Sequence, residues 1–219
     1  MIPPVSSFCF LDNFKQNQLI KIIGIIKYTR ANFNTQFSNN FGNISLTYEL
    51  RKLLDNNRQF QVRFFFGKFL WNNLKDNNYF NYNLSRSPDY LFTSNYLGRS
   101  EKDGLLSQQL VISGGGFKSF FNNANTNNLI VTSNINIGIW KWFEAYSDFG
   151  LIKNFDESSR FFYGSGIRLN ILPDFFELYF PIHTSNGFEI NDYRYHNKIR
   201  FIVSYSLESL GKLFSRRWL

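Results

Sequence analysis

Residues 160–182 read RFFYGSGIRLNILPDFFELYFPI, and this stretch decides the fold class. From Phe161 to Ile171 every second side chain is aromatic, aliphatic or small, while the positions between them include Gly164 and Arg168. A turn at Pro173-Asp174 follows, and the alternation then resumes. Because successive side chains of a strand point to opposite faces, the pattern predicts two strands. Each has an apolar face and a face that carries charge and glycine.

The same alternation recurs along the chain and predicts about ten strands. The further candidates are residues 19–29, 44–53, 59–71, 79–97, 106–120, 129–139, 143–153 and 198–207. Most have about the ~9–11 residues with which a tilted strand crosses a bilayer. Trp71, Trp140 and Trp142 fall at strand ends, where a membrane interface collects aromatic residues. We therefore expect an all-β fold, an antiparallel transmembrane β-barrel, closed by residues 198–207 pairing with a strand near Leu19.

The composition favours strands over helices as the membrane-crossing elements. Aromatic residues make up 20% of the 219 residues, yet the mean hydropathy is −0.28, so apolar and polar residues are interleaved. Interleaving suits a transmembrane strand and excludes a transmembrane helix. The net charge of +8 would suit nucleic acid or anionic lipid. The basic residues form no continuous stripe, so we expect no nucleic acid partner.

The predicted organisation has three parts. Residues 1–18 show no sustained pattern and form a lead-in, residues 19–207 form the barrel, and residues 208–219 form a short amphipathic segment at an interface. The N-terminus lacks the basic and apolar regions of a signal peptide. We therefore expect the export signal to lie upstream and the chain to be the C-terminal part of a longer protein. Cys9 is the only cysteine, so no internal disulfide can form.

The polar strand faces carry charges of both signs. An unpaired charge inside a narrow barrel is costly, so we expect these side chains to pair across the interior as a structural network instead of forming a catalytic dyad. The predicted lumen-facing residues are Glu49, Arg51, Arg63, Glu144, Asp148, Arg168, Glu177, Lys198 and Arg200.

The sequence contains no recognisable catalytic or metal-binding motif. His183 and His196 are the only histidines, and neither an H-E-x-x-H pair nor a Cys/His cluster with metal spacing is present. Gly114-Gly115-Gly116 lacks the Lys-Ser/Thr pair of a phosphate loop, so we interpret it structurally, as a run that permits a bulge or tight curvature in the strand at 106–120. No catalytic residue, metal or cofactor is expected, and we predict that the chain is not an enzyme.

Several blocks of sequence occur in a recognisable order. They are YLGRSE (96–101), GLLSQQ (104–109), IWKWFEAY (139–146), GLIKN (150–154), SGIRLN (165–170), DFFELYFP (174–181), KIRF (198–201) and LFSRRW (213–218). Together they resemble the C-terminal region of zinc aminopeptidase-like (gluzincin) proteins of certain Gram-negative bacteria. In that family an N-terminal peptidase precedes a β-rich, barrel-like region. The resemblance runs from about residue 79 to the end. The peptidase module and its zinc motif are missing here, so no catalytic residue carries over.

These observations lead to one main functional hypothesis and one alternative. The main hypothesis is a non-catalytic outer-membrane β-barrel domain that anchors or accompanies a periplasmic zinc aminopeptidase-like module, with outer-membrane lipid and that module as partners. Both termini would be periplasmic, on the side of the short turns at 55–57, 98–104, 140–142 and 173–174. The longer loops at 30–43, 72–78, 122–128, 154–159 and 184–197 would face outward. The alternative is a soluble all-β binding module for carbohydrate or protein.

Overall fold

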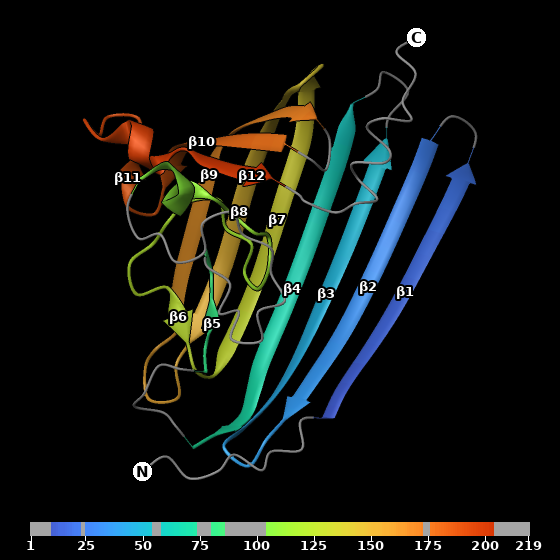
Figure 1. The fold of residues 1–219 in the computed structure, drawn as a ribbon, viewed down its shortest axis with the longest axis vertical. Helices are drawn as coiled ribbons and strands as arrows, with labels where there is room; N and C mark the ends of the chain where they lie inside the picture. Colours follow the sequence, from blue (N-terminus) through green and yellow to red (C-terminus); the bar gives the residue numbers. More distant parts are fainter. Residues whose placement is uncertain are drawn as a thin grey trace.

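The computed structural model describes residues 10–22, 25–53, 58–73, 80–85, 104–172 and 176–203. Ten strands form one antiparallel sheet in the order β1-β2-β3-β4-β7-β8-β9-β10-β11, with β12 beside β10, and β5 and β6 form a separate pair (Figure 1). Their bounds are β1 (Phe10–Ile22), β2 (Ile25–Phe37), β3 (Phe41–Leu53), β4 (Gln59–Asn72), β5 (Tyr82–Asn83), β6 (Asn125–Thr126), β7 (Leu129–Trp140), β8 (Phe143–Lys153), β9 (Arg160–Leu172), β10 (Phe176–Thr184), β11 (Gly187–Phe188) and β12 (Arg200–Val203). The prediction of an all-β, antiparallel fold is confirmed.

The two faces of the sheet follow the alternation in the sequence. In β8, Glu144 and Asp148 are 4% and 0% exposed, whereas Phe143 and Phe149 are both 42% exposed. Along β4, β7 and β9 the polar positions Arg63, Asn134 and Arg168 are buried in the same way, but the inner face also buries Phe65, Phe69 and Ile130. The charged residues of these strands therefore lie on the inner face, which they share with a cluster of buried aromatic and aliphatic side chains.

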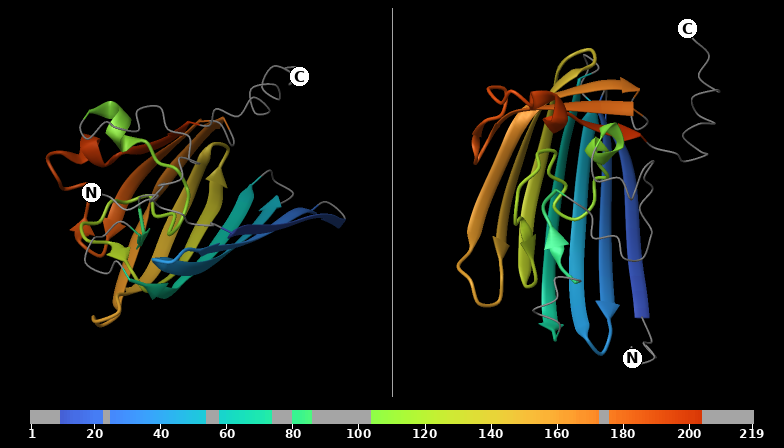
Figure 2. Two further views of the ribbon diagram at one scale, coloured as in Figure 1. Left: turned by 60° about the horizontal axis from the view of Figure 1, so that its bottom comes forward. Right: turned by 60° about the vertical axis from the view of Figure 1, so that its left-hand side comes forward.

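The sheet is curved, and other parts of the polypeptide occupy its concave side. Figure 2 shows β5, β6 and the irregular chain around them inside the curve. We call residues 104–126 the inner segment. Phe117 and Phe121 of this segment pack with Leu84 against Ile130 and Ile152 on the inner face of β7 and β8. A Cβ on Gly150 would lie 2.8 Å from the Phe117 ring, so the glycine permits this close packing.

Two predictions about the N-terminal part are wrong. The predicted lead-in at 1–18 overlaps β1, and the predicted loop at 30–43 contains most of β2 and the start of β3. β2 pairs with β1 and β3 along its whole length, from Phe10↔Phe37 to Ile22↔Ile25 on one side. The Asn-rich composition suggested a loop, but residues 30–37 alternate at period two, and two neighbouring strands satisfy their backbone groups.

The predicted strands at 79–97 and 106–120 do not belong to the large sheet. Within them the described residues form the two-residue strand β5, a 3₁₀ helix (Leu105–Gln108) and irregular chain; residues 86–103 lie outside the description. Gly114 and Gly116 have φ of +54° and +67°, which favours glycine. A Cβ on Gly115 would lie 2.6 Å from the Leu84 Cα. The glycine run therefore turns the chain sharply through the interior, and the predicted sheet strand at 106–120 is wrong.

Barrel closure between β12 and β1 is not found in the described part of the chain. There β12 pairs with β10, β1 pairs with β2, and Figure 2 shows an open curve between these edges. β1 begins level with Trp71, whereas β12 ends level with Leu172, at the opposite end of the sheet. The first and last described strands therefore begin and end at opposite ends of the sheet, while the two termini, for which one common side was predicted, lie outside the described residues. The sheet has one more strand in its N-terminal part than predicted, and two predicted strands lie in the interior instead. The number of strands that lead from one described end to the other therefore changes from even to odd.

The connections partly follow the predicted alternation. The reversals at 23–24, 141–142 and 173–175 join strands at one end of the sheet, and those at 38–40 and 154–159 join strands at the other. β10 stops halfway, because Thr184 is level with Gly164 and Asp148. The connection at 184–197 therefore starts from the middle of the sheet. Residues 98–103 and the tail at 208–219 lie outside the described residues. No described helix is long and apolar enough to cross a membrane.

Candidate functional site

The outer face of the sheet carries exposed apolar side chains on most of its long strands, and we call this set the apolar band. Its members are at least one-third exposed: Phe33, Leu46, Tyr48, Phe64, Ile137, Ile139, Phe143, Phe149, Leu151, Phe161, Ile167 and Ile171. Trp71 lies at the end where β4 finishes and stacks on Phe37 at 5.7 Å. Trp140 lies at the opposite end and stacks on Phe143 at 6.3 Å. Aromatic rings thus border the apolar band at both ends.

A first polar network crosses the inner face of β3, β4, β7 and β8. The Arg63 guanidinium lies 3.7 Å from the Glu49 carboxylate and donates a hydrogen bond to the Asn134 Oδ1 at 3.1 Å. Asn134 in turn donates from its Nδ2 to the Asp148 carboxylate at 2.9 Å. Arg63, Asn134 and Asp148 are all at most 5% exposed. The structure therefore brings together three of the charged residues that the sequence placed in the interior.

A second polar network joins β8, β9 and β10. The Arg168 guanidinium donates to the Glu144 carboxylate at 2.8 Å and also forms an ion pair with Glu177. Asn170 donates to the other Glu144 oxygen at 3.1 Å, and the Tyr179 hydroxyl donates to Glu177 at 2.5 Å. All five side chains are buried. Each charge has an opposite partner and a further hydrogen bond, which is what a buried ion pair requires.

Lys118 of the inner segment is a network member that sequence reasoning missed. Its Nζ lies 2.5 Å from the Asp148 Oδ1, its backbone N–H donates to the Asp148 Oδ2 at 3.0 Å, and the side chain is 1% exposed. Burial lowers the pKa of Lys118, and the adjacent Asp148 carboxylate opposes this by favouring the charged form. The segment has no periodic pattern, so only the isolated lysine among small and apolar residues hinted at a buried charge.

The remaining predicted residues lie apart from these pairs. Lys198 belongs to a 3₁₀ helix (Tyr195–Lys198) and forms ion pairs with Glu189 and with Asp192, the latter at 2.7 Å. Arg200 of β12 donates to the Ser107 carbonyl at 3.2 Å and lies 5.6 Å from the Phe120 ring centroid. Arg51 is half-buried opposite Gln61. Glu189 and Asp192 were not anticipated, because they occupy a non-periodic connection.

The polar interior offers little access for chemistry. The charged atoms of the two networks are almost fully buried and already engaged by one another. Among the described residues no group of three or more His, Cys, Asp or Glu side chains could hold a metal ion. His183 instead packs its ring between Tyr163, at 5.5 Å, and Phe188, at 4.5 Å. The Lys118–Asp148 ion pair ties the inner segment to the sheet, and the second network joins β8, β9 and β10 with one another.

Comparison of the chain with protein-family models, with curated proteins and with solved structures finds no match. The resemblance to gluzincin-associated barrel regions therefore stays a prediction, supported by the order of the sequence blocks alone.

Proposed function

We propose that this chain forms the wall of a transmembrane β-barrel, a non-catalytic domain of a Gram-negative outer membrane. The observation that supports this most is the inverted distribution of side chains. Arg168, Glu144 and Asp148 are buried, while Phe161 and Ile139 are 60% and 51% exposed. Soluble monomers rarely expose a contiguous apolar surface of this kind. If lipid surrounds the outer face, the exposed apolar side chains there are favourable, and so are the buried polar side chains of the inner face.

The height of the apolar band supports the same proposal. Phe64 pairs with Ser133 at its middle, Trp71 lies seven residues from Phe64 along β4, and Trp140 lies seven residues from Ser133 along β7, in the opposite direction. At ~3.3 Å per residue the two tryptophans are about 46 Å apart along the strands. A tilt of ~40° reduces this to about 35 Å. The hydrocarbon core is ~30 Å thick, so both rings would lie at its interfaces.

Closure of the barrel is part of the proposal. An unpaired sheet edge in hydrocarbon leaves backbone groups unsatisfied, and each costs several kcal/mol. We therefore propose that the edges formed by β1 and β12 are joined in the membrane. β12 contributes four described residues, fewer than the ~9–11 of a spanning strand, so this edge is where closure is most demanding.

The filled interior supports an anchoring role over an open pore. The inner segment occupies the concave side and is held by the Lys118–Asp148 ion pair and by the packing of Phe117. The proposed partner, a periplasmic zinc aminopeptidase-like module, rests on the sequence resemblance. Because β1 begins at the end opposite the short reversals, a module joined directly to β1 would lie on the outer side, so we propose that the chain accompanies a separate periplasmic module. We expect the chain alone to show no peptidase activity and to bind no zinc stoichiometrically in elemental analysis.

Membrane fractionation tests the central proposal. The chain, exported in a Gram-negative host, should remain in the outer-membrane fraction after a wash with urea, should need detergent for extraction, and should migrate anomalously in SDS unless heated. Recovery of folded protein in the aqueous fraction would contradict the proposal and favour the soluble binding module.

Surface labelling tests the proposed orientation, in which the short reversals face the periplasm. Lys141 lies at the end with the short reversals and Asn39 at the opposite end, and both are exposed. In a Cys9→Ser background, Asn39→Cys should react with an impermeant maleimide on intact cells and Lys141→Cys should not. The reverse result would invert the topology, and equal labelling would contradict the membrane location.

A further inference from the structure

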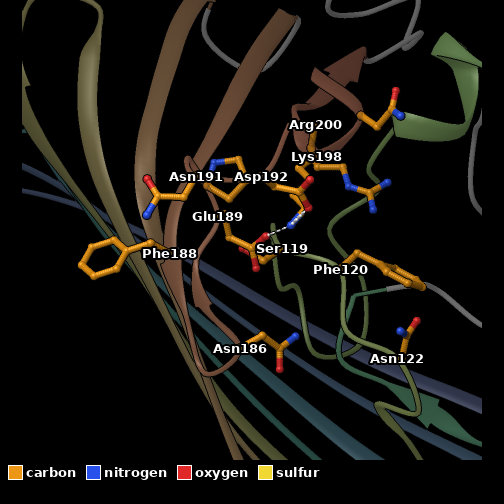
Figure 3. Close-up of a pocket in the computed structure, with 12 residues that line it drawn as sticks. Ser119, Phe120, Asn122, Asn186, Phe188, Glu189, Asn191, Asp192, Lys198 and Arg200 are labelled. Carbon is orange, nitrogen blue, oxygen red and sulfur yellow. Dashed lines mark hydrogen bonds and ion pairs between the residues drawn. The ribbon is translucent and has the colours of Figure 1, made fainter. Parts of the chain in front are cut away.

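A pocket of about 520 Å³ opens between the inner segment and the chain that follows β10. Small-molecule sites in proteins typically measure ~300–1,000 Å³. Its walls come from five parts of the chain: the inner segment, the β10–β11 hairpin, the connection after β11, the 3₁₀ helix Tyr195–Lys198 and β12. Figure 3 shows the ion pairs of Lys198 at the centre, with Phe188 and Asn191 on one side and Phe120 and Asn122 on the other. None of these groups takes part in the two inner networks.

The central part of the pocket is held by hydrogen bonds and ion pairs. Glu189 is 7% exposed, accepts a hydrogen bond from the Thr184 hydroxyl at 2.7 Å, and forms an ion pair with Lys198. Asp192 accepts from Lys198 at 2.7 Å and, through its other oxygen, from the Arg194 backbone N–H at 3.0 Å. These bonds fix the connection after β11, so a ligand would meet a preformed surface.

The charges lining the pocket cancel. Two carboxylates, Glu189 and Asp192, face two cations, Lys198 and Arg200. Lys198 is shared between both carboxylates, and Arg200 donates to the Ser107 carbonyl. A free phosphate would have to compete with these carboxylates, and a metal cation would have to displace the lysine. The electrostatics therefore favour an uncharged ligand.

The rim supplies amides and aromatic rings. Four exposed asparagines line the pocket, and no side-chain hydrogen bond ties any of them to another described residue: Asn122, Asn186, Asn191 and Asn197. Each amide offers two donors and an acceptor. Phe120 and Phe188 add rings that are 39% and 65% exposed. Amides that both donate and accept match hydroxyl groups, which do the same, and exposed rings match the apolar faces of a sugar ring.

We propose that this pocket binds a neutral saccharide. The proposal combines the preformed pocket, the cancelled charge, the amides without partners and the two rings, and it does not depend on the membrane location. An apolar ligand would leave the four amides unsatisfied. An anionic or cationic ligand would disrupt the ion pairs of Lys198.

A glycan array probed with the detergent-solubilised full chain tests the proposal. Binding should concentrate on neutral glycans and should require no sulfate, phosphate or sialic acid. Titration calorimetry with the best neutral trisaccharide should then show saturable binding. Asn186→Ala combined with Asn191→Ala should weaken it about tenfold, and Phe120→Ala should weaken it to a similar extent. Asn39→Ala, an exposed asparagine far from the pocket, should leave the affinity unchanged.

Both amides in the double variant are exposed, so their removal should not affect folding. The proposal is overturned if no neutral glycan on the array binds, or if the double variant and Phe120→Ala both bind as tightly as the unmodified chain. Binding confined to acidic glycans or to inorganic phosphate would overturn it as well, because the pocket would then be an anion site.

Discussion

Two phenylalanines on one strand provide a matched test of where the lipid lies. Phe143 and Phe149 both belong to β8, both point outward and both are 42% exposed. They differ in depth. Phe149 pairs with Ser133, in the row halfway between Trp71 and Trp140, whereas Phe143 pairs with Trp140 at the edge. Arginine at each position therefore compares two depths with the residue type and exposure held constant.

The expected magnitude follows from the strand geometry. Six residues separate the two side chains, which is about 20 Å along the strand and about 15 Å in depth at a tilt of ~40°. That distance takes a side chain from the midplane of a ~30 Å hydrocarbon core to its boundary. Arginine on the lipid face costs ~2–4 kcal/mol at the midplane and ~0–1 kcal/mol near the interface. Phe149→Arg should therefore cost ~2–3 kcal/mol more than Phe143→Arg, roughly 30- to 150-fold in the folding equilibrium.

The assay is urea-induced unfolding of each variant from lipid vesicles, followed by tryptophan fluorescence and by mobility in SDS. Phe143→Arg also loses the stacking of its ring on Trp140, but a guanidinium can replace part of this as a cation–π contact. Costs that agree within ~0.5 kcal/mol, or a larger cost at Phe143, would refute a bilayer centred on the Phe149 row.

Two further predictions concern charges. Lys118→Met leaves the Asp148 carboxylate buried without its cation and should lower the free energy of unfolding, measured in urea, by ~3–5 kcal/mol. Adding Asp148→Asn should restore the free energy of unfolding to within ~1 kcal/mol of the unmodified chain. Exposed Lys153→Met is the control and should change it by less than ~0.5 kcal/mol, whereas equal losses in the single and double variants would contradict the pairing. The hydrogen bond with Lys198 lowers the pKa of Asp192 below 3.8, and its counterpart with Asp192 raises the pKa of Lys198 above 10.5. The Asp192–Lys198 ion pair therefore persists around neutral pH and is lost as pH falls through the lowered pKa of Asp192 or rises through the raised pKa of Lys198. Saccharide affinity should be flat around neutral pH, and a step there would contradict this.

The sequence predicts the faces of the strands well because a face is a local property. In β8 and β9 the side of the sheet on which Glu144 or Arg168 lies follows from counting by two along one strand, and no distant contact can change it. The same rule would have identified β2, where Phe33 and Phe37 alternate with Asn32 and Asn34. The Asn-rich composition of that stretch is typical of a loop, but its period of two predicts the strand that the structure has.

The position of the chain between β4 and β7 cannot be predicted from its own sequence pattern. The Gly114–Gly116 run indicates an irregular segment, but it does not predict whether that segment lies outside the sheet or on its concave side. That choice depends on packing against Leu84, Ile130 and Ile152, which come from three other parts of the chain. For the same reason Lys118 was missed, although its partner Asp148 was identified from the strand pattern.

The filled interior and the apolar exterior are consequences of one another. Once the outer face is apolar, the charged residues of β4, β8 and β9 must turn inward, where water is scarce and each needs an internal partner. Strand neighbours supply most of them: Arg63 meets Glu49, and Arg168 meets Glu144 and Glu177. Asp148 has Asn134 and Gly164 as its paired neighbours on the sheet, and the inner segment provides its ion-pair partner, Lys118. The inner segment is thus required by the charge balance of the wall. A variant that deletes it should leave Asp148 uncompensated and destabilise the sheet itself, whereas a soluble sheet with a wet polar face would tolerate the deletion.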